Sequence, residues 1–149
     1  MGNKYPKSKA VALPVQLLQL RQTYGDVIVE SEIKGSVLRS TLLLTPSRES
    51  ATYKILISYK LSDYAPHAFL IEPMVQLHDG KLPEHVYNYD KDGHPRLCVY
   101  HPDSNEWDRK MFLSTSVVPW VLTWLNAYEY WLITGEWFYP SISHGKKKE

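Results

Sequence analysis

The feature that most restricts the fold is the segment from Ser116 to Thr134, which carries apolar side chains at helical spacing on two faces. The two stripes consist of Val118, Val121, Leu122, Leu125 and Leu132, and of Trp120, Trp124, Tyr128 and Trp131. A helix with apolar residues on two faces is stable in water only if other parts of the protein cover both. Gly135 follows at once and predicts the C-terminal cap. We therefore expect a long helix that is mostly covered on both sides.

The remaining regular segments predict one further helix and a set of strands. Apolar residues recur at helical spacing from Ala12 to Tyr24, and Gly25 can end this helix. Strand-like runs follow at residues 26–33, 36–44, 53–61 and 68–77, the last broken by Pro73. Because short turns separate successive runs, they predict an antiparallel meander. The expected fold class is α+β, with an N-terminal helix, a four-stranded antiparallel meander, an irregular segment and a C-terminal helix.

The chain is expected to form a single domain over residues 1–149, with residues 1–10 and 145–149 as flexible tails. A membrane span at Ser116 to Thr134 is disfavoured because Asn126 and Glu129 lie in the middle of the segment. The N-terminus has no apolar core of a secretory signal, and the single cysteine cannot form an internal disulfide. These features favour the cytoplasm.

Composition narrows the class of partner. The chain has 17 basic and 16 acidic side chains, and its formal net charge is +1. Proteins that bind nucleic acid usually carry a basic surplus on one face. The near-neutral charge therefore predicts no nucleic-acid partner. We also expect no membrane partner and no cofactor.

The stretch from Asp79 to Asp108 is rich in Gly and Pro and contains Cys98, the only thiol of the chain. Long irregular segments inside compact domains are usually functional. Three interpretations of Cys98 compete at this point. In the first interpretation, Cys98 is a buried packing residue, since Leu97 and Val99 flank it as in a strand. In the second it is a zinc ligand, and in the third it is a nucleophile.

The zinc interpretation groups His94, Cys98 and His101, with His85 as a fourth ligand, although structural zinc sites usually contain more thiolates. In the nucleophile interpretation, nearby histidines and backbone N–H groups lower the pKa of the thiol or stabilise an oxyanion. A cysteine-protease dyad fits the nucleophile interpretation too. The residues alone leave these alternatives open.

The second half of the sequence resembles a known family. The matching segments are Ala65-Pro66-His67-Ala68-Phe69-Leu70, His85-Val86-Tyr87, Leu97-Cys98-Val99-Tyr100, Trp107, Val118-Pro119-Trp120 through Trp124-Leu125, Tyr128-Glu129, and Thr134-Gly135-Glu136-Trp137. Together they resemble the prokaryotic ubiquitin-conjugating-enzyme-like families, in particular the stand-alone conjugating proteins of bacterial cyclic-oligonucleotide anti-phage signalling systems (CBASS). The resemblance spans roughly residues 60 to 140, and the first half agrees in element order.

The resemblance implies a ubiquitin-conjugating-like fold and a cysteine-dependent transferase. Cys98 would accept the C-terminal acyl group of a partner protein as a thioester, and an amine would then attack it to give an amide. Eukaryotic members carry a His-Pro-Asn triplet before the cysteine, whose Asn serves the oxyanion. This sequence has His85-Val86-Tyr87 and then Asn88, so the resemblance assigns His85, Asn88 and His101 as candidate helpers of Cys98.

The resemblance also implies a partner, a cyclic-GMP-AMP-synthase-like (cGAS-like) nucleotidyltransferase whose C-terminus is conjugated to prime antiviral signalling. Loading would occur either directly or with an activating enzyme in trans. Two other functions fit the same fold, a non-catalytic binding scaffold and a thiol hydrolase that releases the acyl group. The acceptor lysine is open, and Lys146, Lys147 and Lys148 are candidates for self-modification.

Overall fold

The computed structural model describes residues 9–99 and 106–137 and has an α+β fold, as predicted. Two α-helices and one short 3-10 helix accompany a single sheet in this part of the chain. The helices are α1 (Leu13–Tyr24), η2 (Leu113–Thr115) and α2 (Val117–Thr134). The strands are β1 (Ile28–Lys34), β2 (Val37–Leu44), β3 (Tyr53–Tyr59), β4 (His67–Glu72), β5 (Val86–Tyr89) and β6 (Pro95–Leu97).

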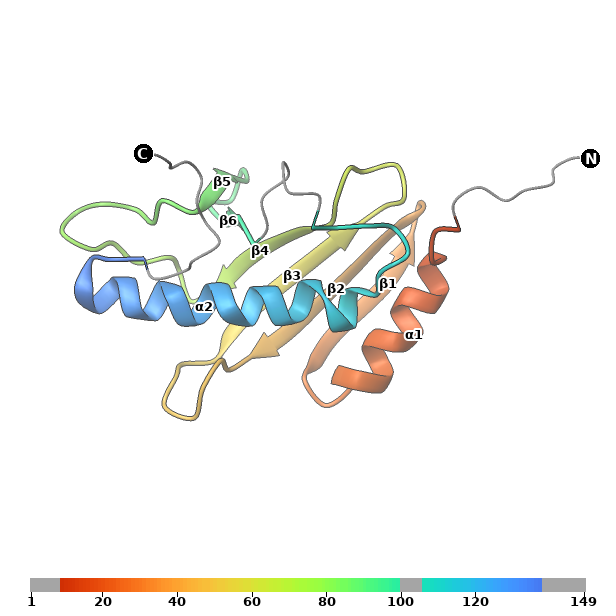
Figure 1. The fold of residues 1–149 in the computed structure, drawn as a ribbon, viewed down its shortest axis with the longest axis horizontal. Coiled ribbons are helices and arrows are strands. Elements are labelled where there is room, and N and C mark those ends of the chain that lie inside the picture. The colour runs from red at the N-terminus through yellow and green to blue at the C-terminus, as the bar shows by residue number, and fades with distance from the viewer. Residues whose placement is uncertain (1–8, 100–105, 138–149) are drawn as a thin grey trace, which may run out of the picture.

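The sheet has six strands in the order β1-β2-β3-β4-β6-β5 rather than the four that were predicted. The first four form the predicted antiparallel meander, and β4 ends at Glu72 before Pro73, where the sequence broke the run. The two additional strands come from the segment predicted to be irregular. They contain only four and three residues, too few to show a period. The irregular segment therefore extends the sheet beyond β4 with β6 and β5 (Figure 1), and Cys98 directly follows β6.

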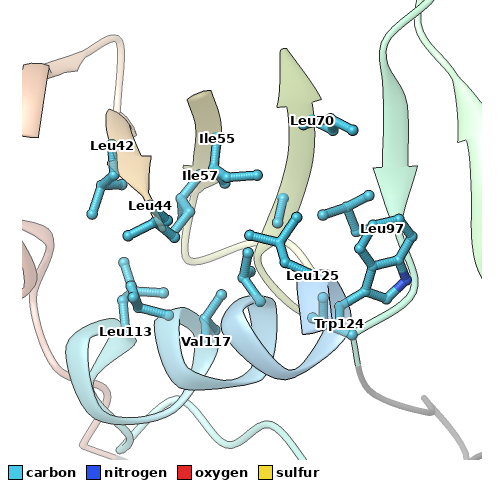
Figure 2. Close-up of a cluster of buried hydrophobic side chains, with 14 of the residues drawn as sticks. Leu42, Leu44, Ile55, Ile57, Leu70, Leu97, Leu113, Val117, Trp124 and Leu125 are labelled. Carbon is cyan, nitrogen blue, oxygen red and sulfur yellow. The ribbon is translucent and has the colours of Figure 1, made fainter. Parts of the chain in front are cut away.

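Helix α2 lies across one face of the sheet and forms the core with it (Figure 1). Figure 2 shows strand side chains pointing toward η2 and α2. The labelled strand residues are Leu42, Leu44, Ile55, Ile57, Leu70 and Leu97, and the helical ones are Leu113, Val117, Trp124 and Leu125. All ten are buried. The two apolar stripes thus serve one core, in which the aromatic stripe contributes Trp124, Tyr128 and Trp131.

Both helices end as the sequence predicted. Gly135 adopts the left-handed conformation with φ of 81°, and its N–H donates to the carbonyl of Trp131 at 2.7 Å. A side chain at this position would meet the ring of His78, so the absence of a Cβ also permits a close contact. Within the described residues, no helix is both long enough and apolar enough to cross a bilayer.

Helix α1 lies beside β1 and β2 (Figure 1), and a buried amide joins it to the segment that leads into η2 and α2. Gln16 is fully buried, and its side chain both donates to the carbonyl of Met111 at 2.8 Å and accepts from the N–H of Leu113 at 2.9 Å. A buried polar side chain is tolerated when its groups are paired in this way. The link fixes the segment that leads into α2.

Candidate active site around Cys98

The β5–β6 hairpin determines where Cys98 lies. Cys98 follows β6 directly, and its backbone N–H donates to the carbonyl of His85 at 3.0 Å. Leu97 pairs with Val86 and is buried, so strand alternation turns Cys98 to the other side of the hairpin. The thiol is half-buried. The hairpin therefore brings together Cys98 and His85, two of the residues expected at the site.

A bulge shapes the hairpin next to this pair. Val86 pairs with Leu97 and Tyr89 pairs with Pro95, so that two residues, Tyr87 and Asn88, face the single residue Arg96. Bulges of this kind redirect side chains and are common beside active sites. The Arg96 guanidinium lies over the Tyr87 ring, 4.3 Å from its centroid. Tyr87 is thereby directed to the side that carries Arg96.

The core holds the hairpin from the other side through an aromatic cluster. The indole Nε1–H of Trp124 donates to the same His85 carbonyl that Cys98 uses, at 2.9 Å. The His85 ring packs on Trp137 with 4.7 Å between centroids, and Trp137 in turn contacts Trp124 at 5.3 Å. Trp124 is fully buried. One carbonyl oxygen therefore connects the cysteine backbone to the centre of α2.

Cys98 opens into a shallow depression of about 360 Å³. Its lining consists of Glu84, His85, Val86, Tyr87 and Cys98. Asn88 is exposed and does not line it. Since a strand rises about 3.3 Å per residue, Asn88 lies roughly 10 Å along the hairpin from the His85–Cys98 pair. His101 lies outside the described residues, as do Lys146, Lys147 and Lys148.

Burial raises the pKa of the Cys98 thiol above its ordinary value, and the negative charge of Glu106 acts in the same direction. A hydrogen bond from the Tyr87 side chain and the positive charge of Arg96 oppose the rise in pKa. Desolvation is the largest of these effects, because it disfavours the charged thiolate. The resting thiol is therefore protonated at neutral pH, and the two groups that favour the thiolate are Tyr87 and Arg96.

Among the described residues, His85, His94 and Cys98 do not come together as in the zinc site considered from the sequence, and His101 lies outside this part of the chain. His94 lies at the tip of the hairpin, where its Nδ1 is 3.0 Å from a carboxylate oxygen of Asp90. Among the described residues, the group of potential ligands that lies close enough to hold an ion is Asp90, Asp92 and His94, and it does not include Cys98. The Asp90 carboxylate already accepts backbone N–H groups from Asp92 and His94, which explains the cluster as turn structure.

Comparison with known protein families assigns the chain to one of them. The profile of the type II CBASS E2 protein family matches residues 16–145. The chain belongs to this family, which indicates a conjugating-type role within a CBASS system and association with the proteins of such a system. The search among curated proteins gave no significant match.

Sequence reasoning identified Cys98 and His85 but gave no role to Tyr87, Arg96 or Trp124. Tyr87 belongs to the matched segment His85-Val86-Tyr87, but its residue type alone does not show what its side chain contacts. Its proximity to Arg96 depends on the bulge, which has no sequence signal in a four-residue strand. Trp124 was expected to pack in the core, and it does, while its N–H also reaches the hairpin. Only the three-dimensional register shows these additional contacts.

Proposed function

We propose that the protein carries the C-terminal acyl group of a partner protein as a thioester on Cys98 and transfers that group to an amine. One observation carries the proposal. The only thiol of the chain opens into a depression, on a hairpin that the buried Trp124 fixes to the core. A merely structural cysteine would need no such opening. Membership of the type II CBASS E2 family supports the same reaction.

The transfer step balances as aminolysis of a thioester. The amine nitrogen adds to the carbonyl carbon, and the C=O electron pair moves to oxygen to give a tetrahedral oxyanion. The intermediate collapses, the C–S bond breaks, and the Cys98 thiolate leaves and takes up the proton released by the amine. The products are an amide and a free thiol. Stabilisation of the oxyanion by a preformed donor contributes about 3 kcal/mol in comparable reactions.

The raised pKa of Cys98 fits a carrier thiol rather than a spontaneously reactive one. At neutral pH the protonated thiol reacts slowly with stray electrophiles, because the thiolate is the nucleophile. Loading then depends on an activated acyl donor, such as a thioester on an activating enzyme in trans. Thiol exchange transfers the acyl group and releases the donor thiol.

The acyl donor we propose is the C-terminus of a cGAS-like nucleotidyltransferase of the same CBASS system. The support is the family, since type II CBASS E2 proteins act within such systems. Because the thiol lies in a depression, an extended C-terminal segment can reach it, whereas a folded surface cannot enter. The protein is proposed to act where antiviral signalling is primed, in the cytoplasm.

Co-expression with the nucleotidyltransferase tests the proposal. Non-reducing gels and intact mass should reveal an adduct of the two chains in the wild type that thiols cleave. Cys98→Ser should trap an adduct that thiols do not cleave, because the serine forms an ester, and Cys98→Ala should form none. Binding of the partner with no adduct in any variant would favour the scaffold, and release of a free acid without an amide would favour the hydrolase.

A further inference from the structure

Tyr87 and Arg96 form a pair beside Cys98 to which neither the family motif nor the composition assigns a role. Arg96 precedes Cys98 by two positions, so alternation puts both side chains on the same side of the hairpin. Across the bulge, Tyr87 faces Arg96 and is a diagonal neighbour of Cys98. Aromatic side chains reach diagonal neighbours in antiparallel pairs. The lining of the depression includes Tyr87 and excludes Asn88.

We propose that Tyr87 is a catalytic hydrogen-bond donor at Cys98 and that Arg96 is the residue that positions it. The inference rests on the proposed function, in that the reaction it serves is acyl transfer through Cys98. It gives to Tyr87 the contact with the oxyanion that the resemblance assigned to Asn88.

The geometry lets one hydroxyl act at two stages. Tyr87 lines the same depression as Cys98 and is its diagonal neighbour, and its side chain lowers the pKa of the thiol by favouring the thiolate form. When the thiolate adds to an acyl carbon, an S–C bond forms and the C=O electron pair moves to oxygen. That oxygen is bonded to the same carbon as Sγ, so it comes within reach of the same donor. On collapse the C–S bond breaks, and the hydroxyl donates again to the departing thiolate. Tyr87 keeps its proton throughout.

Arg96 contributes orientation and charge. Its guanidinium lies 4.3 Å from the centre of the Tyr87 ring, a contact that restricts the ring to one orientation. Its positive charge also favours the thiolate. Lysine at this position would preserve the charge without the planar stacking surface. Arg96→Lys therefore separates orientation from charge, and Arg96→Gln removes both.

The first measurement uses iodoacetamide, which reports on Cys98 alone because the chain has a single cysteine. Tyr87→Phe keeps the ring and its contact with Arg96 but removes the hydroxyl. Loss of a hydrogen bond to a charged group lowers the thiolate population about tenfold. The more basic thiolate is intrinsically more reactive, which restores about threefold. Alkylation at pH 8, followed by intact mass, should therefore slow about threefold.

Tyr89→Phe is the matched control. Tyr89 lies two positions along the same strand, and its hydroxyl has no hydrogen-bond partner among the residues that the structure describes. Its loss should leave the alkylation rate unchanged. Urea unfolding of both variants should give wild-type midpoints, so that a change in rate cannot be ascribed to unfolding. Equal rates for wild type and Tyr87→Phe would overturn the proposal.

The second measurement follows conjugation to the co-expressed nucleotidyltransferase under single-turnover conditions. Removing an oxyanion donor costs on the order of a hundredfold in rate, so Tyr87→Phe should slow adduct formation to that extent. The rate of adduct formation in Arg96→Lys should fall between those of wild type and Tyr87→Phe.

A wild-type rate in Tyr87→Phe, or a larger loss of rate in Asn88→Ala, would overturn the assignment. If wild type forms no adduct through Cys98, the proposed function fails instead, and the alkylation result still decides whether Tyr87 donates to the thiol.

Discussion

Two strand pairs of the sheet, β2–β3 in its interior and β5–β6 at one edge, are built in different ways. Strands β2 and β3 have eight and seven residues, pair in continuous register, and alternate buried with less buried positions. Strands β5 and β6 have four and three residues and are interrupted by a bulge. The first pair gives apolar area to the core under α2, and the second gives side chains to the depression at Cys98. In this sheet, the pair in continuous register supplies the core, and the bulged pair directs side chains toward the depression at Cys98.

Removal of core volume should affect the scaffold and leave the thiol alone. Leu125 is fully buried on α2 beneath the sheet (Figure 2). Leu125→Ala should lower the free energy of unfolding by about 3 kcal/mol, because it removes buried methyl groups and leaves a cavity. Urea unfolding measures this loss. The rate of Cys98 alkylation in the folded protein should match wild type, and a large change in that rate would mean that the two regions are not separable.

The connection between the two regions is the hydrogen bond from Trp124 to His85. Trp124→Phe and Trp131→Phe each replace a buried indole of α2. Trp124 alone of the two donates to the His85 carbonyl. We expect Trp124→Phe to cost about 1 kcal/mol more than Trp131→Phe, the worth of one hydrogen bond. Amide hydrogen exchange at Cys98 should quicken in Trp124→Phe only, and equal exchange in both variants would count against the connection.

The pH dependence of the thiol should reveal the desolvation at the hairpin. Burial raises the pKa of Cys98, so a smaller fraction is thiolate at pH 8 than in an exposed cysteine. Alkylation at pH 8 should be roughly severalfold slower than for a short cysteine peptide. The rate should reach half of its maximum at a higher pH than for the peptide, whose thiol has the ordinary pKa of about 8.5. A profile that levels off below pH 8 would contradict the description of the site.

The smallest effect is expected on the solvent-facing side of the meander. Lys54 and Glu72 form an ion pair with 3.8 Å between Nζ and Oε2, and the Glu72 side chain is 66% exposed. Exposed ion pairs of this kind contribute less than about 1 kcal/mol. Glu72→Gln should therefore change the free energy of unfolding by about 0.5 kcal/mol or less. Thermal unfolding at low and high salt measures the difference, and a loss comparable to that of Leu125→Ala would be inconsistent with it.

The sequence was sufficient for the scaffold because the scaffold is periodic. Both α-helices begin and end within one residue of the predicted bounds, and Gly135 caps α2 as expected. The four strands of the meander begin within two residues of the predicted starts, but β4 ends at Glu72, five residues before the predicted end of its run. These elements repeat a pattern over many residues, so the pattern can be recognised from the sequence alone.

The site was only partly predictable because its geometry depends on short, irregular segments. Cys98 was identified because it is a unique residue in a matched motif. Tyr87 was not, since its direction comes from a bulge in a four-residue strand. Asn88 was preferred because it is the same residue type as the family's Asn, although it is exposed and lies outside the lining of the depression. Residue type is visible in a sequence, whereas the direction of a side chain in an irregular strand is not.

The most direct test of the account is the mass and the attachment site of the adduct. The wild-type protein, isolated with its nucleotidyltransferase and quenched in acid, should show the summed mass of the two chains less one water. Thiol treatment should restore both chains, and peptide mapping should place the bond on Cys98. The same adduct in Cys98→Ala would contradict the account, because the acyl group would then be carried by another residue.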